Sequence, residues 1–392
     1  MIKLSRVLTI GGLLAALPAS AAYAPIPVQD QEKSLNVSVR AGLSHDSNIF
    51  GAAANEVDSA IWTLAPRIDY TASLTDQTFL SAGYGLTLDR FDRRPGDKLV
   101  DSHDLSVRLA HAFSQATTID LNESFLVSRN PESLLAGVPL NTDQSFTRNQ
   151  LDGRFVTPLA PKTGLTAKAR STYYQYRNDS LGRNLDRTET LVGFAADHRL
   201  VPELKLVGEY RFQDVSYRRS GDLKDKTSHY LMAGADYEVA QKTSLSARLG
   251  GERRSRDTER DLTAPFAEFS VKHDYAPKSY LAGGYVYTIE ETSDVVRFTD
   301  AKVHRIFGTV QHAVSALVIA SASVTYEPSQ LQGRRGFADV DETNVRSGAA
   351  LTYLPTKNWS ASATFDHDRV QSDDTSRRLR RARIAVSATY AF

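Results

Sequence analysis

The chain has 392 residues, no cysteine, and 47 lysines and arginines against 46 aspartates and glutamates. A mean hydropathy of −0.35, without any apolar run of about 20 residues, excludes a protein that crosses a membrane repeatedly with helices. The missing cysteines exclude disulfides, thiolate zinc sites and cysteine nucleophiles. The net charge of +1 gives no general attraction to nucleic acid, and no nucleic-acid partner is expected.

The first residues predict a secretory signal peptide over residues 1–21. Lys3 and Arg6 precede an apolar run at 7–17, and Pro18 and a stretch of small residues follow it. The run is too short to anchor the chain in a bilayer, although a buried N-terminal helix is the alternative interpretation. We expect cleavage after Ala21 or Ala22, a short periplasmic segment over 22–34, and folding beyond the inner membrane.

From residue 35 onward the hydrophobic pattern has a period of two. In the segment 35–44, Leu35, Val37 and Leu43 share one face, and polar or small residues occupy the other. About ten alternating residues is the length that a tilted strand needs to cross a bilayer. The same pattern recurs to the end of the chain, for example over 80–89 and 318–327.

Short connections alternate with long polar ones, which predicts a series of antiparallel hairpins. We therefore expect an all-β fold over residues 35–392, a transmembrane antiparallel up-and-down β-barrel of about 18 strands (16–18), with its short turns in the periplasm. The strands near 117–128 and 144–157 are the weakest, because Glu123 and Asn149 fall on an otherwise apolar face. The expected short turns are Ser73–Asp76, Ser114–Thr117, Leu159–Thr163, Val201–Leu204, Ala240–Thr243, Ala276–Ser279, Ser315–Leu317 and Pro355–Asn358, and the expected long loops include Phe91–Asp101, Arg129–Gln144, Arg177–Arg187, Tyr217–Thr227, Arg253–Thr263 and Pro328–Asp341.

The last strand carries an assembly signal. Tyr390 and Phe392 end an amphipathic segment, which resembles the recognition sequence of the outer-membrane barrel assembly machinery. A soluble β-sandwich or β-solenoid is the alternative. Aromatic residues on the outward parity gather near strand ends, as membrane-interface girdles do, and all nine histidines share that parity. A Ser-His or Asp-His catalytic site facing the lumen is therefore not expected.

The inward parity is expected to line a lumen. Charges of both signs occur there in similar numbers, so strong ion selectivity is not expected, and pairing between strands that merely satisfies these groups is the simpler alternative. We predict no catalytic, cofactor-binding or metal-binding residue, and no cofactor. The predicted lumen-lining residues are Arg40, Arg67, Asp69, Arg108, Lys168, Arg170, Glu209, Arg211, Arg248, Glu252, Glu268, Lys272, Arg346 and Asp366.

Paired arginines recur in the long connections, for example Arg93-Arg94 and the run from Arg377 to Arg383. Arginine suits bidentate contacts with phosphate or carboxylate, so outer-membrane lipid and lipopolysaccharide are expected partners. Acidic residues such as Asp373 and Asp374 are interleaved, and solvated loops with internal ion pairs are the alternative.

After the first strand the sequence reads His45-Asp46-Ser47-Asn48-Ile49-Phe50. Together with the strand array, this stretch resembles the beta-barrel porin 2 family of Gram-negative outer membranes, in which a Tyr-Asp-Asp-Asn-Ile-like stretch is common. His45 and Ser47 depart from that pattern. The resemblance implies an outer-membrane channel and, for some members, a link to exopolysaccharide export. Components of a polysaccharide export system are therefore among the partners that the resemblance implies.

The leading hypothesis is therefore a porin-like outer-membrane channel that passes polar solutes or a secreted polysaccharide and is not an enzyme. Two alternatives belong to other classes. One is a barrel hydrolase acting on lipid or lipopolysaccharide, which requires a histidine with a serine or an acid on the lipid-facing rim. The other is a structural or adhesive barrel with binding loops.

Overall fold

The computed structural model describes residues 34–138, 142–219, 224–257, 259 and 261–392. The predicted signal peptide and nearly all of the segment 22–34 lie outside the described residues. Among the residues described, no helix is long and apolar enough to cross a membrane.

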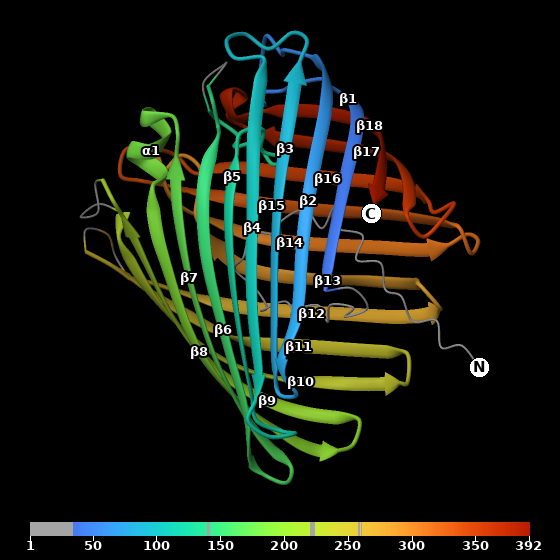
Figure 1. The fold of residues 1–392 in the computed structure, drawn as a ribbon. Coiled ribbons are helices and arrows are strands. Elements are labelled where there is room, and N and C mark those ends of the chain that lie inside the picture. The colour runs from blue at the N-terminus through green and yellow to red at the C-terminus, as the bar shows by residue number, and fades with distance from the viewer. Residues whose placement is uncertain (1–33, 139–141, 220–223, 258, 260) are drawn as a thin grey trace.

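The fold is one antiparallel sheet of 18 strands that closes on itself, because β1 pairs with both β2 and β18 (Figure 1). Every strand pairs with its neighbours in sequence, so the barrel has up-and-down topology. The predicted strand number and fold class are confirmed. The strands are β1 (Leu35–Asp46), β2 (Ser59–Thr75), β3 (Thr78–Phe91), β4 (Leu99–Ala112), β5 (Thr118–Ser128), β6 (Phe146–Ala160), β7 (Thr163–Tyr176), β8 (Arg187–Val201), β9 (Leu204–Tyr217), β10 (Lys226–Ala240), β11 (Thr243–Arg256), β12 (Leu262–Ala276), β13 (Ser279–Glu290), β14 (Phe298–Ala313), β15 (Val318–Gly333), β16 (Val340–Tyr353), β17 (Trp359–Ser372) and β18 (Leu379–Ala391).

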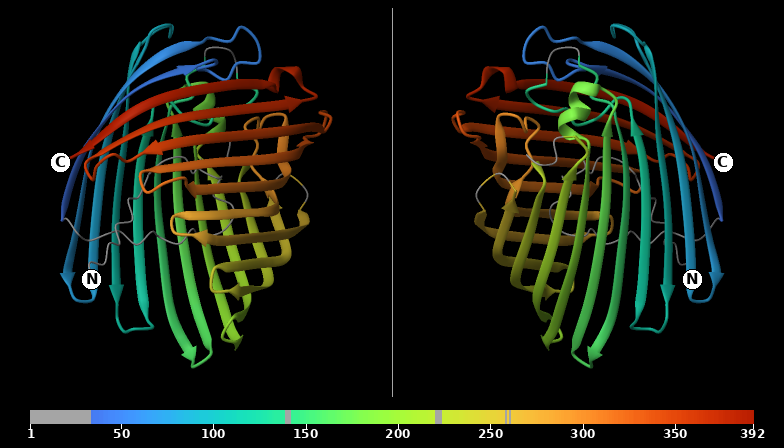
Figure 2. Two further views of the ribbon diagram at one scale, coloured as in Figure 1. Left: turned by 90° about the vertical axis from the view of Figure 1, so that its right-hand side faces the viewer. Right: turned by 90° about the vertical axis from the view of Figure 1, so that its left-hand side faces the viewer.

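The two ends of the barrel differ. At one end of the barrel the strands are joined by short turns, and the first strand starts and the last strand ends there, at Leu35 and Ala391. At the opposite end the strands are joined by longer connections. The longer connections hold the helix α1 (Asp179–Leu185) and the 3₁₀ turn η1 (Thr375–Arg377). Figure 2 shows the hairpin turns at one end of the strands and α1 at the other. We call these the turn end and the loop end.

Two features differ from what the sequence analysis led us to expect: the regularity of β5 and β6, and the length of the connection between β15 and β16. The strands β5 and β6, expected to be the weakest, are formed and pair through Glu123 opposite Leu151. The long loop predicted over 328–341 is shorter than expected, because β15 continues to Gly333 and pairs with β16 up to Leu331 opposite Val340. Pro328, at the start of that stretch, keeps its place opposite Thr343 of β16, whereas the pairing of β15 with β14 skips Pro328 and Glu327.

Glycines on the inner parity permit the curvature of the sheet. A Cβ atom at Gly234 would lie 1.9 Å from the carbonyl oxygen of Ala247, and one at Gly250 would lie 2.1 Å from that of Leu231. No side chain fits at these distances. The strands β10 and β11 can therefore coil tightly at this position only because both residues lack a side chain.

Candidate functional site: the lumen and the mouth of the barrel

The 14 side chains predicted to line the lumen share one face of the sheet. Following the register from strand to strand, for example Arg67 opposite Gly85 and Arg346 opposite Asp368, places all of them on the same parity round the barrel. On this face side chains reach past a neighbouring strand, as Arg67 of β2 does to Asp104 of β4 at 2.6 Å. Such contacts form on the concave side of a curved sheet, so this parity faces the lumen.

Most of these charges are paired along the wall. Arg67 also binds Asp69 at 2.9 Å, and Arg108 binds Asp120 at 2.7 Å. The remaining pairs follow the same pattern and use residues on one strand or on near neighbours. They are Arg170 with Asp152 at 2.5 Å, Glu209 with Arg211 at 2.8 Å and with Lys168 at 3.2 Å, Arg248 with Asp236 at 2.8 Å, Glu252 with Arg254 at 2.8 Å, Lys272 with Asp274 at 3.0 Å, and Asp366 with Arg383 at 3.9 Å.

Three of the predicted residues lack an ion pair within the described part of the chain. Arg40 and Arg346 have no described carboxylate oxygen within 4.0 Å, and one carboxylate oxygen of Glu268 is buried without a hydrogen-bond partner. The wall thus combines paired charges with two arginines, Arg40 and Arg346, that have no carboxylate partner among the described residues, and with one buried carboxylate oxygen of Glu268 that has no hydrogen bond.

A second charged cluster lies at the loop end, and the sequence analysis did not single it out. Asp300 of β14 accepts from Arg254 and Arg256 of β11, and Lys226 of β10 binds Asp300 and Glu291. Burial disfavours ionisation of Glu291, but Lys226 and Arg254 outweigh it and hold the pKa of Glu291 below its ordinary value. The cluster joins three strands, β10, β11 and β14, to the β13–β14 connection, so the order of residues in the sequence could not show which side chains meet.

The connection between β5 and β6 crosses the mouth of the barrel at the loop end. Arg381 of β18 donates to the carbonyl oxygens of Pro131 and Glu132 at 3.4 and 2.9 Å. Ser293 donates to the carbonyl oxygen of Ala136 at 2.8 Å, and Gln144 donates to that of Phe50 at 3.0 Å. This connection therefore touches the first loop, the last strand and the β13–β14 loop.

Apolar side chains pack the same region from the side of α1. Leu181 and Leu185 of the helix meet Val215, Tyr217 and Val295 in a buried cluster, which Leu135 and Val138 of the β5–β6 connection cover in part. The loop end is thus narrowed by packed loops, whereas no comparable connection exists among the short turns.

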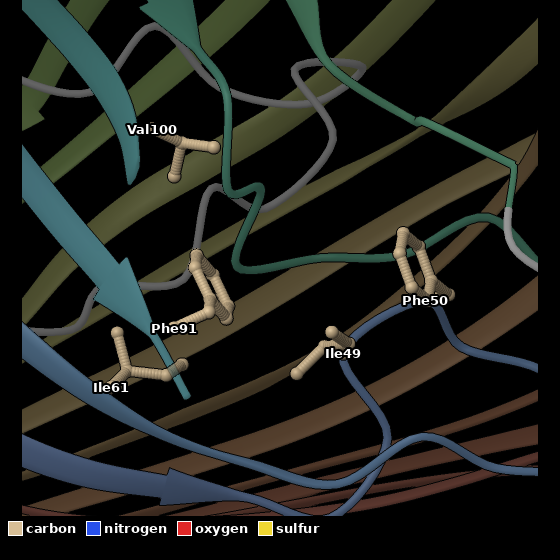
Figure 3. Close-up of a cluster of buried hydrophobic side chains, with 5 residues drawn as sticks. All are labelled: Ile49, Phe50, Ile61, Phe91 and Val100. Atoms are coloured by element: carbon tan, nitrogen blue, oxygen red, sulfur yellow. The ribbon is translucent and has the colours of Figure 1, made fainter. Parts of the chain in front are cut away.

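The stretch from His45 to Phe50, which carried the family resemblance, has a structural role. Asn48 donates to the carbonyl oxygens of Ala52 at 2.8 Å and Arg380 at 3.0 Å, and it accepts from the amide of Ala52 at 2.9 Å. The turn that it forms directs Ile49 and Phe50 into a buried cluster inside the loop end, with Ile61, Phe91 and Val100 (Figure 3).

Histidines on the outward parity belong to two sets of cross-strand pairs. Near the loop end, a tyrosine hydroxyl lies 2.8 to 2.9 Å from a histidine Nδ1 in three pairs with the same spacing of 19 residues: Tyr84–His103, Tyr210–His229 and Tyr285–His304. At the turn end the partners are Thr78–His111, Thr163–His198, Thr243–His273 and Tyr275–His312. Rings with one polar tip and a hydrogen-bonded partner suit the boundary between lipid and water.

One histidine has an acidic partner on the outer rim, which the sequence analysis missed. Nε2 of His103 lies 2.8 Å from a carboxylate oxygen of Asp101, two residues earlier on the same strand. The neighbouring Ser102 faces inward and accepts a hydrogen bond of 3.0 Å from the amide of Arg129. The pair therefore has Tyr84 beside it and not a serine hydroxyl.

The closed sheet, its charged concave face and its apolar outer face define an up-and-down antiparallel β-barrel. No protein-family model and no curated protein matches the chain. Solved structures of similar fold include the FrpB iron transporter of Neisseria meningitidis (F5-1 variant), with a TM-score of 0.49 and 11% identity over 88% of this chain and 64% of that one. OccAB3 of Acinetobacter baumannii has a TM-score of 0.48 and 11% identity, covering 91% and 99%.

The copper transporter OprC has a TM-score of 0.47 and 14% identity, over 88% of this chain and 63% of that one. This chain thus spans less than two thirds of OprC. These similarities concern the barrel alone.

Proposed function

We propose that the chain is a channel of the bacterial outer membrane that passes polar solutes and does no covalent chemistry. The observation that carries this proposal is the division of the sheet into two faces. Large apolar side chains are exposed on the outer face, for example Leu231 at 71%, Leu249 at 67% and Ile384 at 57%, while ion pairs cover the inner face. A closed barrel with such an outer surface satisfies every backbone group within a bilayer.

The proposal includes the route to that membrane. The predicted signal peptide supports export across the inner membrane. The ring centroid of Tyr390 lies 4.9 Å from that of Trp359 and 4.8 Å from that of Phe392. The last strand therefore ends in packed aromatic rings at the turn end. We include recognition of this strand by the barrel assembly machinery, which truncation of Phe392 tests.

The wall and the mouth together support a narrow and weakly selective path. Paired charges leave little net field along the wall, and the β5–β6 connection reduces the opening at the loop end. Small polar solutes are the cargo that this arrangement supports best. Passage of an extending polysaccharide belongs to the same proposal and requires the β5–β6 connection to move aside.

Planar-bilayer recording of the purified protein tests the channel. Stepwise currents with a reversal potential near zero in a salt gradient support it. Silence of a barrel that still shows heat-modifiable migration contradicts it and favours an adhesive barrel. Release of fatty acid from phospholipid or lipopolysaccharide, lost in His103→Ala, would instead support the hydrolase.

A further inference from the structure

Two arginines stand directly opposite each other on the outer surface of the barrel. Arg369 of β17 and Arg380 of β18 are register partners, and both side chains are exposed on the outward parity. Like charges at directly opposed positions of an antiparallel pair destabilise it. An arrangement of this kind calls for a negative charge that holds both guanidinium groups.

The described part of the chain does not supply that charge. No described carboxylate oxygen lies within 4.0 Å of either guanidinium, although other rim arginines do have such partners, as Arg253 has in Asp261 at 3.2 Å. Gln371, with its amide oxygen turned toward Arg369, accepts a hydrogen bond of 2.6 Å from it, but that contact is uncharged. The carboxylates of the same two strands, Asp366 and Asp368, lie on the opposite parity and face the lumen.

The height of the pair on the barrel indicates what the anion is. Arg369 and Arg380 lie near the loop end of their strands, one row beyond His367 and Ala382 and two rows beyond Phe365 and Ile384. The last two side chains are 43% and 57% exposed and belong to the apolar band of the outer face. Groups at the edge of that band meet lipid headgroups.

We infer that Arg369 and Arg380 form a binding site for a phosphate group of an outer-leaflet lipid, with phosphorylated lipid A as the lipid. Two planar guanidinium groups can each donate paired hydrogen bonds to the phosphate oxygens, and its charge removes their mutual repulsion. The inference rests on the proposed position of the barrel in the outer membrane. It places the lipid at the closing half of the sheet, beside the seam between β18 and β1.

The test compares the thermal stability of the folded barrel in vesicles that contain phosphorylated lipid A with its stability in vesicles of dephosphorylated lipid A. The wild-type melting temperature should be higher with the phosphorylated lipid. Arg369→Gln/Arg380→Gln should lose that difference, and the lipid A retained per barrel should fall about tenfold. In the dephosphorylated lipid the same variant should melt at or above the wild type, because the repulsion is gone.

Arg253→Gln is the matched control, since it removes a rim arginine that already has Asp261. It should keep the full response to phosphorylated lipid A. The inference is overturned if the double variant keeps that response, or if inorganic phosphate at equal concentration raises the melting temperature as much as the lipid does. Folding of the double variant is checked by heat-modifiable migration, and Arg380→Gln alone serves if the double variant does not fold. A wild-type chain that never enters vesicles contradicts the proposed function instead.

Discussion

Arg381 and Asp46 join the last strand of the barrel to the first. The guanidinium and the carboxylate meet at 2.6 Å, both side chains are 1% exposed, and 335 positions separate them in the sequence. The same guanidinium donates to the carbonyl oxygens of Pro131 and Glu132. One side chain therefore holds both the seam of the sheet and the connection that crosses its mouth.

Removing one member of this pair should destabilise the barrel strongly. Asp46→Ala leaves the Arg381 charge buried and without its carboxylate, which costs about 3 to 5 kcal/mol. Urea unfolding of the folded barrel in detergent or vesicles measures the loss. Because Arg381 also loses its fixed position, we expect larger conductance fluctuations as the β5–β6 connection is released.

Asp58→Ala provides the control for that measurement. Asp58 pairs with Arg93 at 3.1 Å, but the side chains are 46% and 70% exposed, so the pair contributes about 0 to 1 kcal/mol. Equal effects of Asp46→Ala and Asp58→Ala would show that burial of the seam pair does not matter.

The sequence was sufficient for the fold and for the two faces of its strands, because both follow from local alternation. Leu43 and Val386, for example, show their parity without knowledge of their partner strands. The partners themselves could not be predicted. Asp46 lies in the stretch that resembled a family motif, yet its function in the seam depends on Arg381 at the other end of the chain.

The candidate site shows the same limit. That Arg67 lies on the inward parity follows from the sequence, but its bond to Asp104 skips a strand and depends on the coiling of the sheet. The cluster around Asp300 combines strand ends that the alternation does not delimit, so no local signal identified it.

Removing the basic member of a wall ion pair and removing the acidic member of another should shift the ion selectivity of the channel in opposite directions. Arg67→Gln frees Asp69 and Asp104 and should raise the ratio of cation to anion permeability about twofold, since one charge acts through water with about 1 kcal/mol or less. Asp236→Asn frees Arg248 and should lower the ratio. Reversal potentials in a salt gradient measure both. A shift of the same sign in the two variants would mean that these side chains do not line the conducting path.

Acid should loosen the loop end through Asp374. Burial opposes ionisation of its carboxyl, but hydrogen bonds from Ser376 and Arg297 hold the pKa of Asp374 below its ordinary value. The stability from this group is therefore complete above the unfolded pKa of about 3.9 and is lost as the pH falls through the lower folded pKa. Limited proteolysis of the loops should accelerate over that range, and Asp374→Asn should remove this part of the pH dependence.

Asp373→Asn is the matched control for that experiment. It removes a carboxylate from the adjacent position but leaves the hydrogen bond of 2.6 Å between Arg297 and Asp374 in place. The profile of Asp373→Asn should keep the wild-type decline in acid. If Asp374→Asn keeps the same decline, another group at the loop end controls it.

Glu123 should lower the stability of the barrel in a bilayer. Its carboxylate lies on the outward parity of β5, opposite Leu151 and Val107, which are 49% and 37% exposed, and its one bond to a side chain that the structure gives is from Asn149 at 3.3 Å. A charged group within the apolar band is unfavourable in lipid. Glu123→Leu should therefore stabilise the barrel by about 1 kcal/mol, and Glu123→Gln by less, in urea titrations of folding into vesicles.

Asn122→Leu separates this effect from a general gain in hydrophobicity, because Asn122 is the next residue and has the opposite parity. An added leucine there faces the lumen and should not stabilise the barrel. A loss of stability in Glu123→Leu, with Asn122→Leu unchanged, would contradict a lipid-exposed carboxylate. It would indicate instead that a second protein surface covers β5 and β6 in the membrane and hydrogen-bonds to Glu123.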